Sequence, residues 1–183
     1  MPNHVHLILV PADPDGLRRT LADVHRRYTA HINLRHGWTG HLWQGRFGSV
    51  AMDEDHLACA ARYVALNPVR ARLAERVEDW PWSSARAHLA GRDDGVVRVA
   101  PLLERFGDVA AFLDQPRDNE ESAFDRLRRG ETTGRPAGDD AWIGRLEREH
   151  GRALKPGKRG PKPKSGEAMA PAGTGDLFGK LSP

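Results

Sequence analysis

Two histidines near the start of the chain are spaced so that they could share one metal ion. His4 and His6 flank Val5 in the apolar run HVHLILV, which ends at Pro11. A short run of β-branched and aliphatic residues predicts a buried strand, and alternate side chains of a strand point to the same face. Both imidazoles would then lie on one face. Two interpretations stay open: a pair of metal ligands, or two ordinary polar positions on a sheet.

A tyrosine and an asparagine form the second candidate group. Tyr63 and Asn67 are four residues apart in a segment with helical periodicity, so they share one face of the expected helix. An activated phenol can form a covalent intermediate, and an amide oxygen can bind a metal ion. A half-buried structural tyrosine fits the same pattern. The other tyrosine, Tyr28, falls in the apolar stripe of its own helix and is the weaker nucleophile candidate.

A third group combines aromatic and basic side chains. Trp43, Gln44 and Arg46 are close neighbours in the sequence, and such a mixture suits stacking on unpaired bases and pairing with phosphates. Packing of Trp43 in the core is the alternative interpretation. Arg70 and Arg72 follow the expected helix of Tyr63, and their position makes them candidates for phosphate contacts.

Periodicity and capping residues predict the elements that would position these groups. The apolar stripe that begins at Leu17 predicts a core-facing helix that Gly37 ends, and Pro68 predicts that the Tyr63 helix ends near Asn67. The remaining expected helices share short amphipathic patterns and lie at 85–89, 107–114, 118–129 and 139–150. Strands are expected at 4–10 and 47–52, with a weak third at 96–99. Two strands alone make a marginal sheet.

The composition is that of a globular protein without a membrane anchor. Of the 183 residues, 39% are hydrophobic and 29% are charged, and the apolar runs fall short of the roughly 20 residues that span a bilayer. We therefore expect a cytoplasmic protein with no membrane partner. The single Cys59 excludes an internal disulfide and a Cys-x-x-Cys zinc site. Any metal would need His, Asn, Gln or carboxylate ligands.

The basic charge is concentrated near the end of the chain. The formal net charge is only +3, yet the segment 152–164, RALKPGKRGPKPK, contains basic residues and no acidic one. Its prolines and glycines disfavour helix and strand, which predicts a flexible basic tail. Such a tail suits phosphate contacts, although a purely solubilising tail fits the same composition.

Four segments together resemble the REP-associated tyrosine transposases, which belong to the single-tyrosine HUH transposases. They follow one another in the family's order and read MPNHVHLILVP at 1–11, GHLWQGRF at 40–47, RYVALNPVRARL at 62–73 and WPWSSARAH at 80–88. The resemblance covers residues 1 to 90. Four ordered motifs are far more specific than any one of them.

The resemblance implies a transposase that cleaves and rejoins single-stranded DNA next to hairpins through a 5′-phosphotyrosine intermediate. It implies that Tyr63 is the nucleophile and that His4, His6 and Asn67 are ligands of Mg²⁺ or Mn²⁺. The implied partner is a single-stranded DNA hairpin. Whether the protein acts as a monomer or a homodimer is left open.

The resemblance also implies an α+β fold with a ferredoxin-like antiparallel sheet and helices on one face. The family places a strand, a helix and usually another short strand before its Pro-Asn-His-x-His motif, whereas Met1 directly precedes that motif here. We therefore expect a fold truncated at its N-terminus, which places its activity in question. The expected organisation is a catalytic core at 1–90, a helical extension at 91–150 and a basic, disordered tail at 151–183.

Two other functions stay open at this point. One is a non-catalytic DNA-hairpin binding protein, derived from a domesticated or decayed transposase. The other is a metal-dependent phosphodiesterase that uses water as its nucleophile. A covalent adduct between the protein and DNA would separate all three.

Overall fold

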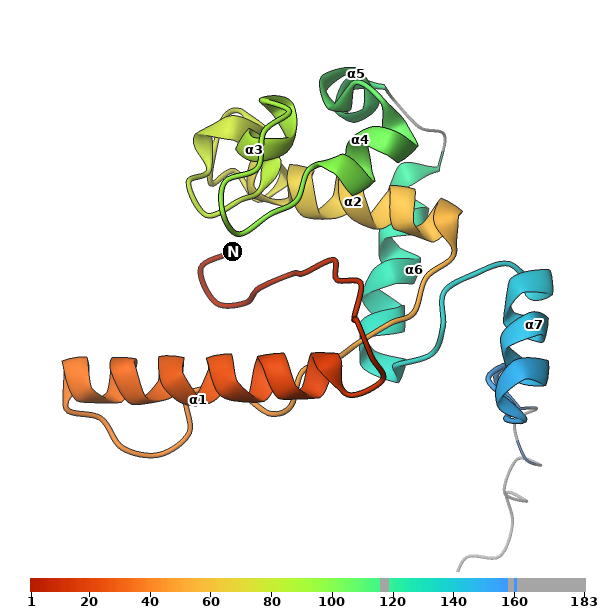
Figure 1. The fold of residues 1–183 in the computed structure, drawn as a ribbon, viewed down its shortest axis with the longest axis horizontal. Coiled ribbons are helices and arrows are strands. Elements are labelled where there is room, and N and C mark those ends of the chain that lie inside the picture. Colours follow the sequence, from red (N-terminus) through yellow and green to blue (C-terminus); the bar gives the residue numbers. More distant parts are fainter. Residues whose placement is uncertain (116–118, 158–159, 161–183) are drawn as a thin grey trace, which may run out of the picture.

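The computed structural model describes residues 1–115, 119–157 and 160, and this part of the chain is helical (Figure 1). It contains seven α-helices and one 3-10 turn and no β-strand. In chain order the elements are α1 (Gly16–His36), α2 (Glu54–Arg70), η1 (Val77–Asp79), α3 (Ala85–Leu89), α4 (Ala100–Phe106), α5 (Val109–Asp114), α6 (Glu120–Thr133) and α7 (Asp140–His150). The predicted α+β fold with a ferredoxin-like antiparallel sheet is therefore wrong for the described residues.

The predicted strands fail because a strand needs a hydrogen-bonded partner, which local sequence does not reveal. Within the described residues, the segment 4–10 has no backbone ladder, and Val5 and Leu7 are 64% and 57% exposed. The segment 47–52 pairs only at an isolated parallel bridge between Met52 and Ala137. The segment 96–99 leads into α4, with Val99 as the N-cap residue of that helix.

The first predicted helix is confirmed, but its expected contact with the core is not. α1 ends at His36, and Gly37 adopts the left-handed conformation (φ 65°) that glycine allows without strain. None of its residues is buried. Figure 1 shows α1 along one side of the molecule, with the N-terminal segment between it and the other helices. Its apolar stripe therefore stays accessible, with Val24 51% exposed.

The helix that carries Tyr63 ends later than predicted. Asp53 caps α2 by accepting a hydrogen bond from the His56 backbone N–H at 2.9 Å. The helix then continues through Pro68 to Arg70. Pro68 is buried, so packing offsets the hydrogen bond that proline cannot donate.

The core lies where α2 meets α6 and α5. One buried cluster comprises Ala60, Tyr63, Phe124 and Leu127, and Ile8 of the N-terminal segment packs against it. A second cluster, on the next face of α2, comprises Ala58, Ala61 and Phe112. The small alanines of α2 allow close approach of the larger side chains on α5 and α6. Figure 1 shows α2 crossing α6 at this point.

A buried arginine also joins α2 to the later helices. The Arg62 side chain is 3% exposed, and its Nε donates to Glu120 Oε1 at 2.5 Å. Its Nη1 donates to the backbone carbonyl of Phe112. Arg62 thus fixes the ends of α5 and α6 against one side of α2.

The remaining sequence predictions have mixed outcomes. Helices were expected close to α3, α5, α6 and α7 and are present, whereas α4 was not anticipated. No described helix has the length and apolar character needed to cross a membrane.

The expected tail at 151–183 lies outside the described residues except for 151–157 and 160. In that described portion, Lys155 Nζ lies 2.7 Å from Asp140 Oδ1.

Candidate active site

The two histidines of the N-terminal segment lie side by side. The rings of His4 and His6 have centroids 4.8 Å apart and are inclined at 79°. The His4 side chain is exposed and its Nδ1 lies 2.7 Å from Asn3 Oδ1. His6 points inward, with 19% of its side chain exposed. Burial, the neighbouring His4 and the N-terminal amine lower the pKa of His6, so the neutral imidazole is favoured.

Tyr63 meets His6 from α2. Their ring centroids are 5.3 Å apart, and the planes are inclined at 76°, an edge-to-face arrangement. Tyr63 is 8% exposed and belongs to the core cluster, so it is more deeply buried than the half-buried tyrosine that the sequence pattern allowed. Its ring also packs edge-on against Phe124, with centroids 5.2 Å apart. The structure thus brings His4, His6 and Tyr63 together from segments some sixty residues apart in the chain.

Helix α6 contributes side chains to this site, and the sequence did not predict that contribution. The Phe124 ring packs against the Tyr63 ring, and the Arg128 guanidinium lies 6.0 Å from the Tyr63 ring centroid. Glu131 Oε1 lies 3.4 Å from His6 Nδ1. Burial raises the pKa of Glu131, although the charges of His4 and Arg128 oppose that rise. The amphipathic pattern indicated the helix, but no local signal indicated its contact with Tyr63.

Asn67 and the two arginines occupy the end of α2 and the turn after it. Asn67 lies one helical turn beyond Tyr63, and its side chain makes no hydrogen bond to another described residue. Arg70 Nη2 donates to Glu121 Oε2 at 2.5 Å, and its guanidinium covers the Phe124 ring at 4.5 Å. Arg72 is exposed and has the left-handed conformation (φ 57°).

The aromatic and basic group at 43–46 lies away from the His6 and Tyr63 rings. Trp43 stacks on His25 of α1 with centroids 4.1 Å apart, and its Nε1 donates to the His25 carbonyl at 3.3 Å. Gln44 and Arg46 are exposed in the same loop. In the described part of the chain, these residues make no contact with Tyr63 or His6. They form a separate surface on α1.

The histidine pair fits part of a metal-binding site. His6 Nε2 is buried and has no hydrogen-bond partner among the described residues, and a metal ion would satisfy its lone pair. A centroid separation of 4.8 Å is compatible with two imidazoles on one ion at about 2 Å from each ligating nitrogen. Among the described residues, no three His, Cys, Asp or Glu side chains gather into a metal-binding group. Other ligands would therefore be an amide, water or a phosphate.

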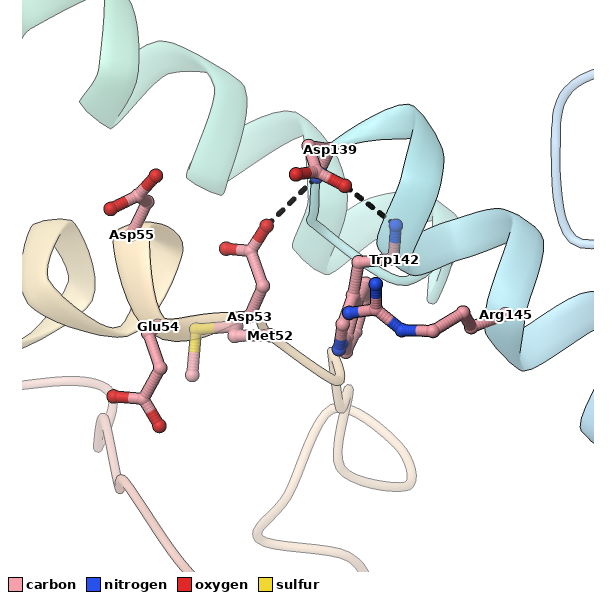
Figure 2. Close-up of a pocket in the computed structure, with 7 residues that line it drawn as sticks. All are labelled: Met52, Asp53, Glu54, Asp55, Asp139, Trp142 and Arg145. Carbon is pink, nitrogen blue, oxygen red and sulfur yellow. Dashed lines mark hydrogen bonds between the residues drawn. The ribbon is translucent and has the colours of Figure 1, made fainter.

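A separate open hollow of about 440 Å³ lies between the starts of α2 and α7 (Figure 2). It is lined by Met52, Asp53, Glu54, Asp55, Asp139, Trp142 and Arg145, which include none of the candidate site residues predicted from the sequence. Asp53 Oδ2 accepts a hydrogen bond from the Asp139 backbone at 2.8 Å, and Asp139 Oδ1 accepts one from the Trp142 backbone at 2.6 Å. Asp53 and Asp139 are the N-cap residues of α2 and α7. Their carboxylates therefore have a structural role, and the hollow marks the place where the two helices begin next to each other.

Two curated relatives share limited similarity with the chain. One, from Haemophilus influenzae, is 28% identical over 95 residues, which is 46% of this chain and 54% of the relative. The other, from Escherichia coli K12, is 25% identical over 113 residues, which is 61% of this chain and 62% of the relative. The chain thus spans between about half and three fifths of the length of the curated relatives it matches. No family model and no solved structure matches the chain. The Haemophilus relative bears the name "Putative REP-associated tyrosine transposase" and the Escherichia coli relative the name "REP-associated tyrosine transposase", so the chain has distant similarity to proteins with these names.

Proposed function

We propose that the protein is a single-tyrosine HUH transposase that cleaves and rejoins single-stranded DNA next to hairpins. The observation that carries the proposal is the edge-to-face contact of His6 with Tyr63, at 5.3 Å between ring centroids, with His4 beside it. Two imidazoles next to a phenol match the residue types that metal-assisted attack on a phosphodiester requires. The names of the curated relatives support the same class of protein.

In the proposed reaction, Tyr63 supplies the nucleophile. Its phenol oxygen forms a bond to the phosphorus, and the bond between phosphorus and the 3′-oxygen breaks. The phenol proton passes to solvent, and the departing 3′-oxygen takes up a proton. The product is a 5′-phosphotyrosine with a free 3′-OH. A second DNA 3′-OH can attack this ester in the reverse sense, which rejoins strands without ATP.

Other residues of the chain would hold the DNA in place for this step. His4 and His6, with Asn67 as a further candidate, would bind Mg²⁺ or Mn²⁺, which would withdraw charge from the phosphate when bound. Phe124 holds the Tyr63 ring in a fixed orientation. Arg70 and Arg72 would contact phosphates beside the cleaved bond, after Arg70 leaves Glu121. Trp43, Gln44 and Arg46 would contact the DNA at the separate surface on α1.

The proposal is tested by trapping the covalent intermediate. A labelled hairpin oligonucleotide with single-stranded flanks is incubated with the protein and Mn²⁺, and adducts that resist denaturation are separated by electrophoresis. The wild-type protein should form an adduct, and Tyr63→Phe, which keeps the aromatic packing, should form none. Tyr28→Phe is the matched control because Tyr28 is the other tyrosine and is 48% exposed on α1. An adduct that persists in Tyr63→Phe but disappears in Tyr28→Phe would refute the assignment.

A second candidate is a DNA-hairpin binding protein without turnover. The burial of Tyr63, 8% exposed within the core cluster, favours this alternative because a nucleophile must reach its substrate. The same experiment decides between the two. Hairpin binding without an adduct in the wild-type protein supports the binding protein, whereas DNA cleavage without an adduct supports a phosphodiesterase that uses water.

A further inference from the structure

Glu131 lies beside one nitrogen of the His6 ring, and the other ring nitrogen is buried. Its Oε1 lies 3.4 Å from His6 Nδ1, on the edge of the ring opposite the buried and unpartnered Nε2. The His6 side chain is 19% exposed and that of Glu131 is 49% exposed. The two ring nitrogens therefore have different surroundings, one beside a carboxylate and one buried without a hydrogen-bond partner among the described residues.

These surroundings favour one tautomer of the ring. A neutral imidazole carries one N–H donor and one lone pair, and an ionised carboxylate only accepts hydrogen bonds. The proton therefore belongs on Nδ1, facing Glu131, and the lone pair belongs on Nε2. The 3.4 Å separation is longer than the usual hydrogen bond of about 2.9 Å. Contacts of this kind are often long in unliganded sites and shorten when the ligand binds.

The fold holds Glu131 in this place from two directions. Phe124, Leu127 and Glu131 follow one another at helical spacing, so Glu131 continues the face of α6 that packs against α2. On the other side, the loop at residue 48 passes so close that a Cβ on Gly48 would lie 3.2 Å from the Glu131 carbonyl oxygen. Val50 also approaches Gly130, the residue before Glu131.

Glu131 fits a supporting role better than direct metal binding. Among the described residues, His4, His6 and Glu131 do not form a group that could hold an ion together. A carboxylate behind a ligating histidine fixes its orientation and tautomer and increases its basicity, and its loss typically reduces metal affinity by about 10- to 100-fold. We propose that Glu131 is a positioning residue that holds the proton of His6 on Nδ1 and so presents the Nε2 lone pair to a divalent cation. This inference rests on the proposed function, because it assumes that His6 binds a metal.

The tautomer is measurable in the metal-free protein by ¹⁵N NMR of labelled histidines, with the His6 signals assigned from His6→Gln. Protonated and lone-pair nitrogens of neutral imidazole resonate far apart. The wild-type protein should show the proton on Nδ1, and Glu131→Ala should shift it to Nε2. Glu131→Gln should retain the wild-type tautomer because the amide oxygen still accepts a hydrogen bond. A wild-type His6 with its proton on Nε2 overturns the proposal, whatever the variants do.

Mn²⁺ binding, measured by titration calorimetry with the metal alone, is the second readout. Glu131→Ala should bind Mn²⁺ about 10- to 100-fold more weakly than wild type, and Glu131→Gln should lie between the two. The control is Glu149→Gln, which removes one carboxylate charge from an exposed position on α7. Equal Mn²⁺ affinity in wild type and Glu131→Ala also overturns the proposal. The predicted tautomer and Mn²⁺ affinities without a Tyr63 adduct would sustain the role of Glu131 and refute the transposase function.

Discussion

The guanidinium of Arg70 lies over the ring of Phe124, with 4.5 Å between Cζ and the ring centroid. Phe124 is 1% exposed, and its ring packs against the Tyr63 ring with centroids 5.2 Å apart. A single side chain of α6 therefore supports both the candidate nucleophile and a candidate phosphate contact on α2. This arrangement makes the stability of the core and the order of the site depend on the same residue.

Truncating Phe124 should reduce both stability and adduct formation. Phe124→Ala removes a fully buried aromatic ring and should lower the free energy of unfolding by about 3 to 5 kcal/mol. Phe124→Leu should lower the free energy of unfolding by a smaller amount. Urea denaturation followed by circular dichroism measures the loss. Phe106→Leu, at the periphery of the second cluster, serves as control for a substitution away from Tyr63. If Phe124→Leu stays folded and forms adduct at the wild-type rate, Phe124 does not position Tyr63.

Removing the buried charge of Arg62 should be more damaging than removing an exposed arginine. Arg62→Ala removes the buried guanidinium that donates to Glu120 and to the Phe112 carbonyl, which should destabilise the protein by about 3 kcal/mol. The matched variant is Arg26→Ala, which breaks an exposed pair with Asp23 and should change stability little. Equal urea midpoints for these two variants would contradict a structural role for Arg62.

The cap at Asp53 should stabilise the protein at neutral pH and lose its effect in acid. Burial of Asp53 raises its pKa, but hydrogen bonds from the His56 backbone, the His56 ring and the Asp139 backbone together lower it below the ordinary value of 3.8. Because the folded-state pKa is lower, the unfolded state binds more protons in acid, so the contribution is present above about pH 3.8 and declines as pH falls through the folded-state pKa.

Asp53→Asn tests this sign directly. At pH 7 the variant should be less stable than wild type by about 0.3 to 1 kcal/mol, because the amide can still cap the helix but lacks the negative charge that is favourable at a helix N-terminus. The difference between the two unfolding free energies should shrink as pH decreases below 4. Asp55→Asn is a control within the first turn of α2, since Asp55 is exposed and its side chain makes no hydrogen bond to another described residue. A difference that grows with acidity would show that the pKa of Asp53 is raised instead.

Substituting the candidate metal ligands should separate cleavage from DNA binding. His4→Ala and His6→Ala should abolish cleavage, while hairpin affinity measured by fluorescence anisotropy should stay within about tenfold because phosphate contacts supply most of it. Addition of EDTA to the wild-type protein should reproduce the loss of cleavage. His150→Ala, at the exposed end of α7, is the control. Continued cleavage in EDTA would exclude a metal-dependent reaction.

Deletion of residues 158–183 should weaken hairpin binding and reduce its salt dependence without removing the chemistry. This segment lies outside the described residues apart from Gly160, so the expectation comes from its sequence. Four of its basic residues, Lys158, Arg159, Lys162 and Lys164, are close together in the sequence. Each phosphate contact changes the slope of log affinity against log salt by about 0.7 for single strands, so the slope should fall by up to about 3. An unchanged slope would indicate a solubilising tail.

The helices were predictable from sequence because their signals are local. Gly37 ends α1, Asp53 caps α2 and Asp139 caps α7, and each of these residues acts within a few positions of its own place in the chain. The sheet prediction failed because the pattern at 4–10 describes an extended segment but not the backbone that would pair with it. The predicted end of α2 near Asn67 was wrong for a related reason. Pro68 disfavours a helix locally, but its packing in the core outweighs that preference.

The same distinction between local and long-range signals applies to the candidate site. His4, His6 and Tyr63 were chosen by residue type and motif order, and the structure brings their rings together. Glu131 and Arg128 were not chosen, because each meets the site through contacts that span more than sixty positions of the chain. Periodicity places such residues on a helix face but does not identify the opposing surface.

The isolation of α1 has a consequence for hydrogen exchange. A helix without buried residues opens locally, so its backbone amides exchange with deuterium at rates unrelated to global unfolding. The amides of α2 and α6, which enclose the core, exchange only when that core opens. Deuterium labelling should therefore divide the protein into a quickly exchanging α1 and a slowly exchanging pair of helices. Binding of DNA at Trp43 would slow exchange in α1 and leave the protection of α2 and α6 almost unchanged.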